Sequence, residues 1–234
     1  MQKPNSKYHG TVYQITQKIS DRTSKNTRST HLLREAQRIE QAVKSLGDIA
    51  ATKSPTETTA AHFKRVEKSS KRLRKETADA VDRIVALQGA AAQDIDNRIN
   101  QRLNLTQNSY AGELRATLRG MDQKARLATV KDIMSREDGQ GMAAISQAPA
   151  VLSGLTDEVS ARFMDDYTRM YAADLVSERD ALITTASDLS ILTATADKAA
   201  DGFSDPSRLR TIESEEQAAA DAENAFKEVF ELSE

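Results

Sequence analysis

The hydrophobic positions of this chain recur at helical spacing over most of its length. In the stretch 30–51, apolar residues are spaced alternately by four and three, as in the a and d positions of a heptad repeat. The same spacing runs through 55–103 and changes to steps of four after Ala91, which is a stutter. These patterns predict long helices that bury narrow seams. The predicted seam residues are Leu32, Ile39, Val43, Leu46, Phe63, Val66, Leu73, Ile84 and Leu87.

Capping signals predict where these helices begin. Ser54-Pro55-Thr56-Glu57 is typical of a capping box with proline in the first turn, so we expect a helix to begin at Pro55. The polar stretch 104–109 either ends that helix or is crossed by it. Thr156 is the predicted N-cap of a return helix, and Asp205-Pro206 is the predicted start of the last helix.

Two regions are harder to interpret. Val12, Ile15 and Ile19 fit one face of a short helix, but residues 11–16 also alternate as in a strand. No charged residue occurs from Gly139 to Thr156, and its glycines predict a helix end followed by a reversal. The predicted divisions are a basic N-terminal arm (1–28), a long helical hairpin region (29–138), an uncharged reversal loop (139–155), a long return helix (156–203) and an acidic C-terminal helix (204–234).

The predicted fold class is all-α, an elongated helical hairpin or bundle with coiled-coil-like seams. One helix over 55–103 would be roughly 74 Å long. A compact domain of 234 residues is only about 45 Å across. Leu, Ile, Val and Phe together contribute 45 residues, and Ala contributes 34. Because this supply is small for one compact core, we expect neighbouring subunits to complete the seams.

Charge is balanced overall but divided along the sequence. Residues 1–75 carry 17 Lys or Arg and 6 Asp or Glu, net +11, whereas residues 76–234 carry 16 and 29, net −13. One helical face in the basic part is predicted to bind phosphates or an acidic protein surface, or to be merely solvated. This basic face consists of Lys64, Arg65, Lys68, Lys71, Arg72 and Lys75.

The last predicted helix carries acidic residues inside its apolar stripe. Glu residues in a seam make a poor free-standing helix, but they suit a basic partner surface. We therefore predict an acidic docking helix that includes Glu213, Glu216, Glu223, Phe226 and Phe230.

No residue pattern indicates an enzyme. The sequence has no Cys, and His9, His31 and His62 have no second ligand at metal-binding spacing on both sides. Asp165 and Asp166 have no facing cluster, and phosphate-loop or nucleophile motifs are missing. We expect no catalytic residues, metal, cofactor or small-molecule substrate. Neither a secretory signal nor an 18-residue apolar run is visible, which predicts a cytoplasmic chain with no membrane span.

In composition and patterning, the sequence resembles helical structural proteins of tailed-bacteriophage virions. The resemblance lies in the lack of Cys and Trp, in Ala- and Gln-rich heptads such as Glu35-Ala36-Gln37-Arg38-Ile39-Glu40-Gln41-Ala42-Val43, and in a basic arm combined with an acidic tail. It implies a subunit of a capsid, neck or connector, tail or internal structure. Such a protein would be cytoplasmic before assembly and part of the virion afterwards.

Three functional hypotheses follow. The first is a non-enzymatic structural or assembly protein that contacts neighbouring subunits, including copies of itself, through its helices. The second is a nucleic-acid-associated helical protein that makes non-specific DNA contacts through the basic face. The third is a cytosolic coiled-coil adaptor.

Overall fold

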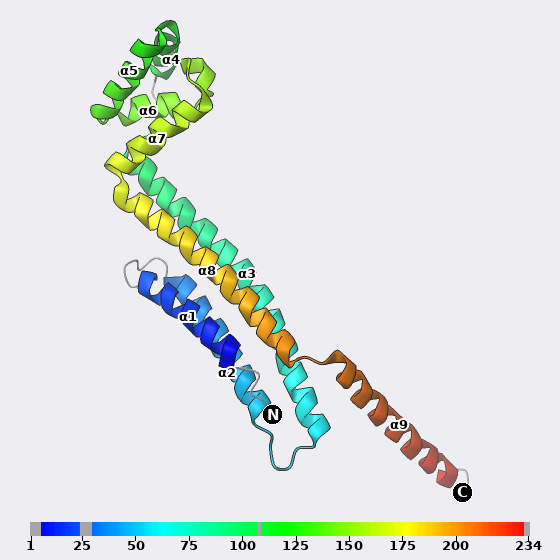
Figure 1. Cartoon of the computed structure of the whole chain (residues 1–234). Helices are drawn as coiled ribbons and strands as arrows, with labels where there is room; N and C mark the ends of the chain where they lie inside the picture. The colour runs from blue at the N-terminus through cyan, green and yellow to red at the C-terminus, as the bar shows by residue number, and fades with distance from the viewer. Residues whose placement is uncertain (1–5, 24–29, 107–108, 232–234) are drawn as a thin grey trace. The chain divides into compact units, whose positions relative to one another are not determined.

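The computed structural model describes residues 6–23, 30–106 and 109–231. These residues form nine α-helices and one short 3-10 helix, and none of them lies in a strand, which confirms the all-α prediction (Figure 1). The elements are α1 (Ser6–Thr23), α2 (Thr30–Ala51), α3 (Thr59–Arg102), α4 (Ala111–Gly120), α5 (Gln123–Ser135), α6 (Gly139–Ser146), η2 (Ala150–Ser153), α7 (Asp157–Tyr171), α8 (Ala173–Phe203) and α9 (Pro206–Glu231).

The chain divides into two compact units, and α3 and α8 each contribute to both. The first unit comprises Met1–Leu87 and Thr185–Glu234, and the second comprises Gln88–Thr184. The first unit therefore contains α1, α2, α9, the first part of α3 and the last part of α8. The second contains the remaining parts of α3 and α8 together with α4–α7 and η2.

Four helical segments form the core of the first unit. Helix α1 packs on α2, and Arg22 of α1 forms an ion pair with Asp188 of α8. Arg83 of α3 bonds Glu35 of α2 at 3.0 Å. The heptad positions supply this core from within one chain, because the side chains of α1 cover those of α2. The buried members include Val12, Ile15, Ile19, Leu32, Ala36, Ile39, Val43, Leu46, Val66, Leu73, Ala80 and Ile84.

Most predicted seam residues are buried without a second subunit. Of the nine, only Phe63 and Leu87 are partly exposed. The expectation that neighbours must complete these seams is therefore wrong for the first unit. Helix α1 packs on α2, and it covers from within the same chain a surface that a neighbouring subunit was expected to cover.

Polar side chains fix the register between α3 and α8. In the first unit, Ser70 donates to the carbonyl of Ala200, and Thr77 donates to the carboxylate of Asp197 at 2.8 Å. As the residue number rises along α3 from Ser70 to Thr77, the residue number of the partner on α8 falls from Ala200 to Asp197. The two segments are therefore antiparallel. In the second unit, Arg98 bonds Glu178 at 2.9 Å, and Arg102 pairs with Asp174.

Short helices form the core of the second unit. Leu118, Val130, Met142, Ile145 and Tyr167 are almost completely buried there. A single guanidinium joins several turns, because Arg126 donates to the carbonyls of Leu118 at 2.8 Å and of Met121 at 2.7 Å.

The structure corrects several predicted boundaries in the first part of the chain. Helix α3 begins at Thr59, not at Pro55, because Thr58 caps it and Glu57 is bound by Arg65. The described part of the 1–28 arm is helix α1, whose buried face excludes the strand alternative. Residues 1–5 and 24–28 of the predicted arm lie outside the described residues.

The predicted reversal loop 139–155 is largely helical. Asp138 caps α6 by accepting from the amide of Gly141 at 2.8 Å. A Cβ atom at Gly139 would lie 1.6 Å from the carbonyl oxygen of Leu103, so this glycine permits close packing and does not terminate a helix.

The predicted return helix 156–203 is two helices. Thr156 caps α7 as expected, but the chain leaves helical geometry at Ala172, with φ −140° and ψ 36°. Asp205 caps the last helix, α9, as predicted, through the amide of Arg208 at 3.0 Å.

Candidate interaction surfaces

The basic face lies on the first turns of α3, and its six members have different partners. Two of them, Lys64 and Arg65, are partly buried and make ion pairs. The other four, Lys68, Lys71, Arg72 and Lys75, are exposed. The sequence-based prediction therefore treated two residues with partners in their own chain and four exposed residues as one group.

Arg65 closes the loop between α2 and α3. Its Nε and Nη2 atoms both donate to Glu57, each at 3.0 Å, and Nη2 also donates to the carbonyl of Thr52 at 2.7 Å. The hydrogen bond from Arg65 holds the pKa of Glu57 below its usual value, and the same bond raises the pKa of Arg65. Arg65 thus stabilises this loop through hydrogen bonds within its own chain.

Lys64 belongs to the junction with α9. It forms an ion pair with Glu216, one of the predicted docking residues. On the residue before Lys64, the Phe63 ring has the guanidinium of Arg208 5.0 Å from its centre, within the range of a cation–π contact. These contacts join the first turns of α9 to the start of α3.

A buried carboxylate organises the same junction. Glu67 is only 3% exposed, and it accepts from the hydroxyl of Ser204 at 2.8 Å and from the amide of Asp205 at 3.2 Å. It thereby binds the two residues between α8 and α9. Sequence reasoning missed this role, although a signal existed: Glu67 is the one acid among the seven bases of 64–75.

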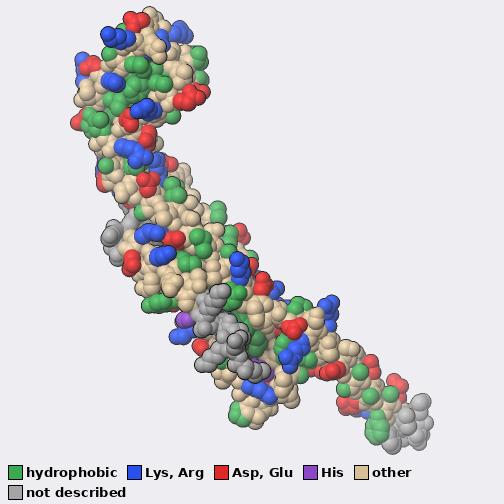
Figure 2. Space-filling view, viewed as in Figure 1, with side chains coloured by type: hydrophobic (Ala, Val, Ile, Leu, Met, Phe, Trp, Pro, Cys, Tyr) green, Lys and Arg blue, Asp and Glu red, His purple; other side chains and the backbone are tan. Residues whose placement is uncertain are grey.

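Beyond this junction, α9 is exposed. Ile212, at 9% exposure, is the one side chain that α9 buries among its described residues. From Glu213 to Glu228 every side chain is exposed, and Phe226 is 65% exposed. Figure 2 shows mainly acidic side chains along this helix. The side chain of Phe230 lies outside the described residues.

Contacts within α9 support it locally. Glu223 pairs with Lys227 at 2.9 Å, and Gln217 donates to Asp221 at 2.8 Å. Each such pair one turn apart contributes only about 0.2–0.5 kcal/mol. The helix therefore gains little from its own side chains compared with what a packed apolar face would provide.

The four exposed cations of the basic face have no ion-pair or hydrogen-bond partner within the described parts of the chain. Lys68, Lys71 and Lys75 fall within about 60° of each other around the helix, and Arg72 lies beside them. By contrast, Arg74 and Arg83 on the flanks of the same helix pair with Asp201 and Glu35. The four cations thus form a compact positive surface that the chain itself leaves available.

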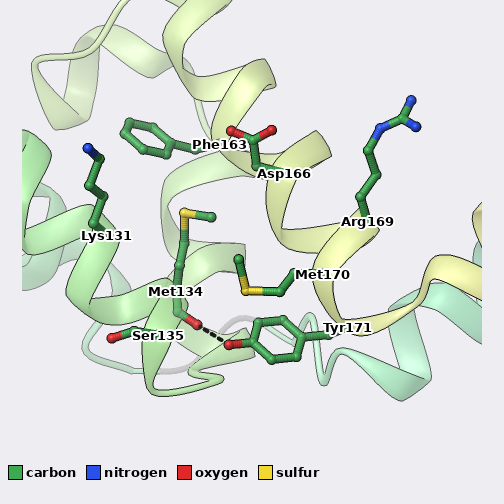
Figure 3. Close-up of a pocket in the computed structure, with 8 residues that line it drawn as sticks. All are labelled: Lys131, Met134, Ser135, Phe163, Asp166, Arg169, Met170 and Tyr171. Carbon is green, nitrogen blue, oxygen red and sulfur yellow. Dashed lines mark hydrogen bonds between the residues drawn. The ribbon is translucent and has the colours of Figure 1, made fainter.

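A groove in the second unit lies between α5 and α7. It encloses about 670 Å³ and is lined by Lys131, Met134, Ser135, Phe163, Asp166, Arg169, Met170 and Tyr171 (Figure 3). The hydroxyl of Tyr171 donates to the carbonyl of Met134 at 3.0 Å and so ties the two helices together. Half of the lining residues of this groove are methionine or aromatic, and Arg169 is paired with Asp165 at 2.8 Å. The chemistry suits an apolar side chain.

Two of the other polar residues singled out in the sequence, His62 and Asp166, lie near groups of opposite charge, whereas Nε2 of His9 is buried without a hydrogen-bond partner among the described residues. His62 lies 3.3 Å from Glu57, and Asp166 lies 4.0 Å from Arg162. No group of three metal-binding side chains occurs within the described residues. Among the helices described, none combines the length and apolarity needed to cross a membrane.

Comparisons with family models, with curated proteins and with solved structures found no match to this chain.

Proposed function

We propose that this chain is a non-enzymatic structural protein that joins a larger assembly through helix–helix contacts, with α9 as its docking helix. The exposure of α9 carries the proposal. Sixteen consecutive side chains, 213–228, are exposed, and α9 buries one residue among those whose burial is described. Most helical stability in proteins comes from packing an amphipathic face. A long helix without such packing in its own chain is well suited to obtain it from a partner.

The assembly that we propose is a tailed-bacteriophage virion. This part of the proposal draws on the resemblance of the heptads and of the basic and acidic ends to helical virion proteins. In this mechanism, α1, α2 and the parts of α3 and α8 in the first unit supply a helical core, and α9 attaches that unit to neighbouring subunits.

A helix-breaking substitution tests the proposal in the full chain. Ala219 is exposed in the middle of α9, so Ala219→Pro interrupts the helix at a cost of about 3 kcal/mol while it leaves the buried core untouched. We expect this variant to be lost from large complexes purified from the source and analysed by mass spectrometry. Ala219→Ser is the matched control and should be retained. Recovery of the unmodified chain only as a free 25.7 kDa species would contradict the proposal.

A second candidate function is non-specific association with nucleic acid. The observation in its favour is the row of four exposed cations on α3, which could follow phosphates. It predicts that duplex DNA is retarded at low salt and released as salt rises. Lys68→Glu combined with Lys71→Glu should weaken retention, and an unshifted duplex at low salt would exclude this function.

A further inference from the structure

We propose that α9 of a second copy lies along the four exposed cations of α3, so that two copies exchange their acidic helices. This inference builds on the proposed function, because it names the partner that α9 binds. It uses two surfaces of the first unit that are both exposed: the remainder of the basic face and the part of α9 beyond Ile212.

The two surfaces have opposite charge. Lys68, Lys71, Arg72 and Lys75 supply four positive charges without a compensating partner in the described chain. Residues 213–231 contain seven acids and one base, a net charge of −6. Complementary surfaces of this kind accelerate association and select the partner, whereas like charges placed opposite each other cost several kcal/mol.

The spacing of the charges also agrees. Lys68 and Lys75 are seven residues apart, as are Asp221 and Glu228, which lie beyond the junction with Lys64. Seven residues correspond to about 10.5 Å and two turns, so each pair lies on one side of its helix. Two helices packed side by side can therefore bring both pairs into register.

One contact of this type already exists within the chain. Glu216 of α9 pairs with Lys64, the first residue of the basic face. The contacts between α9 and α3 involve Phe63, Lys64 and Glu67, all of which precede Lys68. The acids of α9 in the same chain therefore leave the remaining cations unpaired, and a second copy can supply the missing carboxylates.

Reciprocal exchange gives a closed pair of copies. Each copy offers one acidic helix and one basic face, so a two-fold arrangement satisfies both surfaces at once. Nucleic acid would satisfy the basic face but would repel α9. An acidic helix of the same chain type accounts for both features together.

Charge reversal on the full-length chain tests the exchange. A face variant, Lys68→Glu with Lys75→Glu, and a helix variant, Asp221→Lys with Glu228→Lys, should each weaken self-association at least about tenfold, because each places like charges together. An equimolar mixture of the two variants should recover the dimer, since the reversed face of one chain meets the reversed helix of the other. Sedimentation equilibrium at low and high salt measures all three.

The matched control is Lys44→Glu with Lys198→Glu. Both lysines are exposed on other helices of the first unit, and the change in charge equals that of the face variant. This control should associate like the unmodified chain. A monomeric unmodified chain at low salt, or a mixture that stays monomeric, would overturn the exchange. So would duplex DNA bound through Lys68 and Lys75 when self-association does not depend on these residues.

These outcomes separate the inference from the function beneath it. If Ala219→Pro removes the chain from large complexes but the charge-swapped mixture stays monomeric, α9 docks on a different partner and only the exchange fails. If Ala219→Pro has no effect on those complexes, the docking role of α9 itself fails.

Discussion

Helices α8 and α9 follow each other in the sequence, and they differ in what they bury. Helix α8 places apolar and small residues against α3 and the rest of the bundle, including Leu182, Leu189, Leu192, Ala196 and Ala199. Helix α9 is almost as long, at 26 residues against 31, but buries only Ile212 among its described residues. Both helices therefore show helical periodicity. They differ in burial: α8 packs within its own chain, whereas most of α9 is exposed and can contact a partner.

The difference has an energetic meaning. The side chains that α8 buries each contribute on the order of 1.5–3 kcal/mol when they are large. Among its described residues, helix α9 makes its junction with α3 and weak pairs between neighbouring turns, and it buries one large apolar side chain, Ile212. Mutations in the two helices should consequently have very different effects on the free energy of unfolding.

The largest expected effect is a cavity in α8. Leu189 is completely buried, so Leu189→Ala should lower the free energy of unfolding by about 2–5 kcal/mol. Phe226→Ala removes an even larger side chain from α9, but at 65% exposure it should change stability by no more than about 0.5 kcal/mol. Urea denaturation followed by circular dichroism measures both. If the two variants lost similar amounts of unfolding free energy, the claim that α8 is buried and α9 is exposed would be contradicted.

An intermediate effect is expected at the junction between α8 and α9. Glu67→Ala removes the buried acceptor of Ser204 and of the Asp205 amide, which should cost about 1–3 kcal/mol. The loss should appear in the exchange rates of amides at the start of α9 as well as in global stability. If only global stability changes, Glu67 supports the core and does not position α9.

The sequence predicted buried helix positions better than features that depend on contacts between distant segments. The 3.5-residue spacing located the seams because burial of one helical stripe depends on periodicity alone; Ile39, Val43 and Leu73 are buried as expected. The break at Ala172 has no glycine or proline to mark it, so the sequence pattern does not predict it. Gly139 was misinterpreted because its role is contact with Leu103, which is 36 residues away in the sequence.

The candidate surfaces were less predictable than the helices. Side-chain type and spacing identified the basic face and the acidic helix. They could not reveal that Arg65 is engaged by Glu57 or that Lys64 reaches Glu216, because both pairings depend on how helices meet. The groove between α5 and α7 likewise required the fold, since its lining comes from segments about 30 residues apart.

The smallest expected effect is electrostatic, at the start of α8. The hydrogen bond from Arg102 holds the pKa of Asp174 below its usual value. A lowered pKa in the folded state means that this contribution is present above about pH 4 and is lost as the pH falls through the lowered value. NMR titration should report the low pKa, and Arg102→Gln should return it toward normal. An unchanged pKa in that variant would mean that Arg102 is not its cause.

Amide hydrogen exchange across α8 and α9 tests the central claim most directly. In a dilute protein solution at high salt, charge-driven association is screened. Under these conditions the amides of α8 should be strongly protected from exchange, and those of 213–228 should be weakly protected. At high protein concentration and low salt, protection should rise in α9 and remain unchanged in α8. Protection in α9 that already equals that of α8 in the isolated chain, and does not respond to assembly, would contradict the account of α9 as a docking helix.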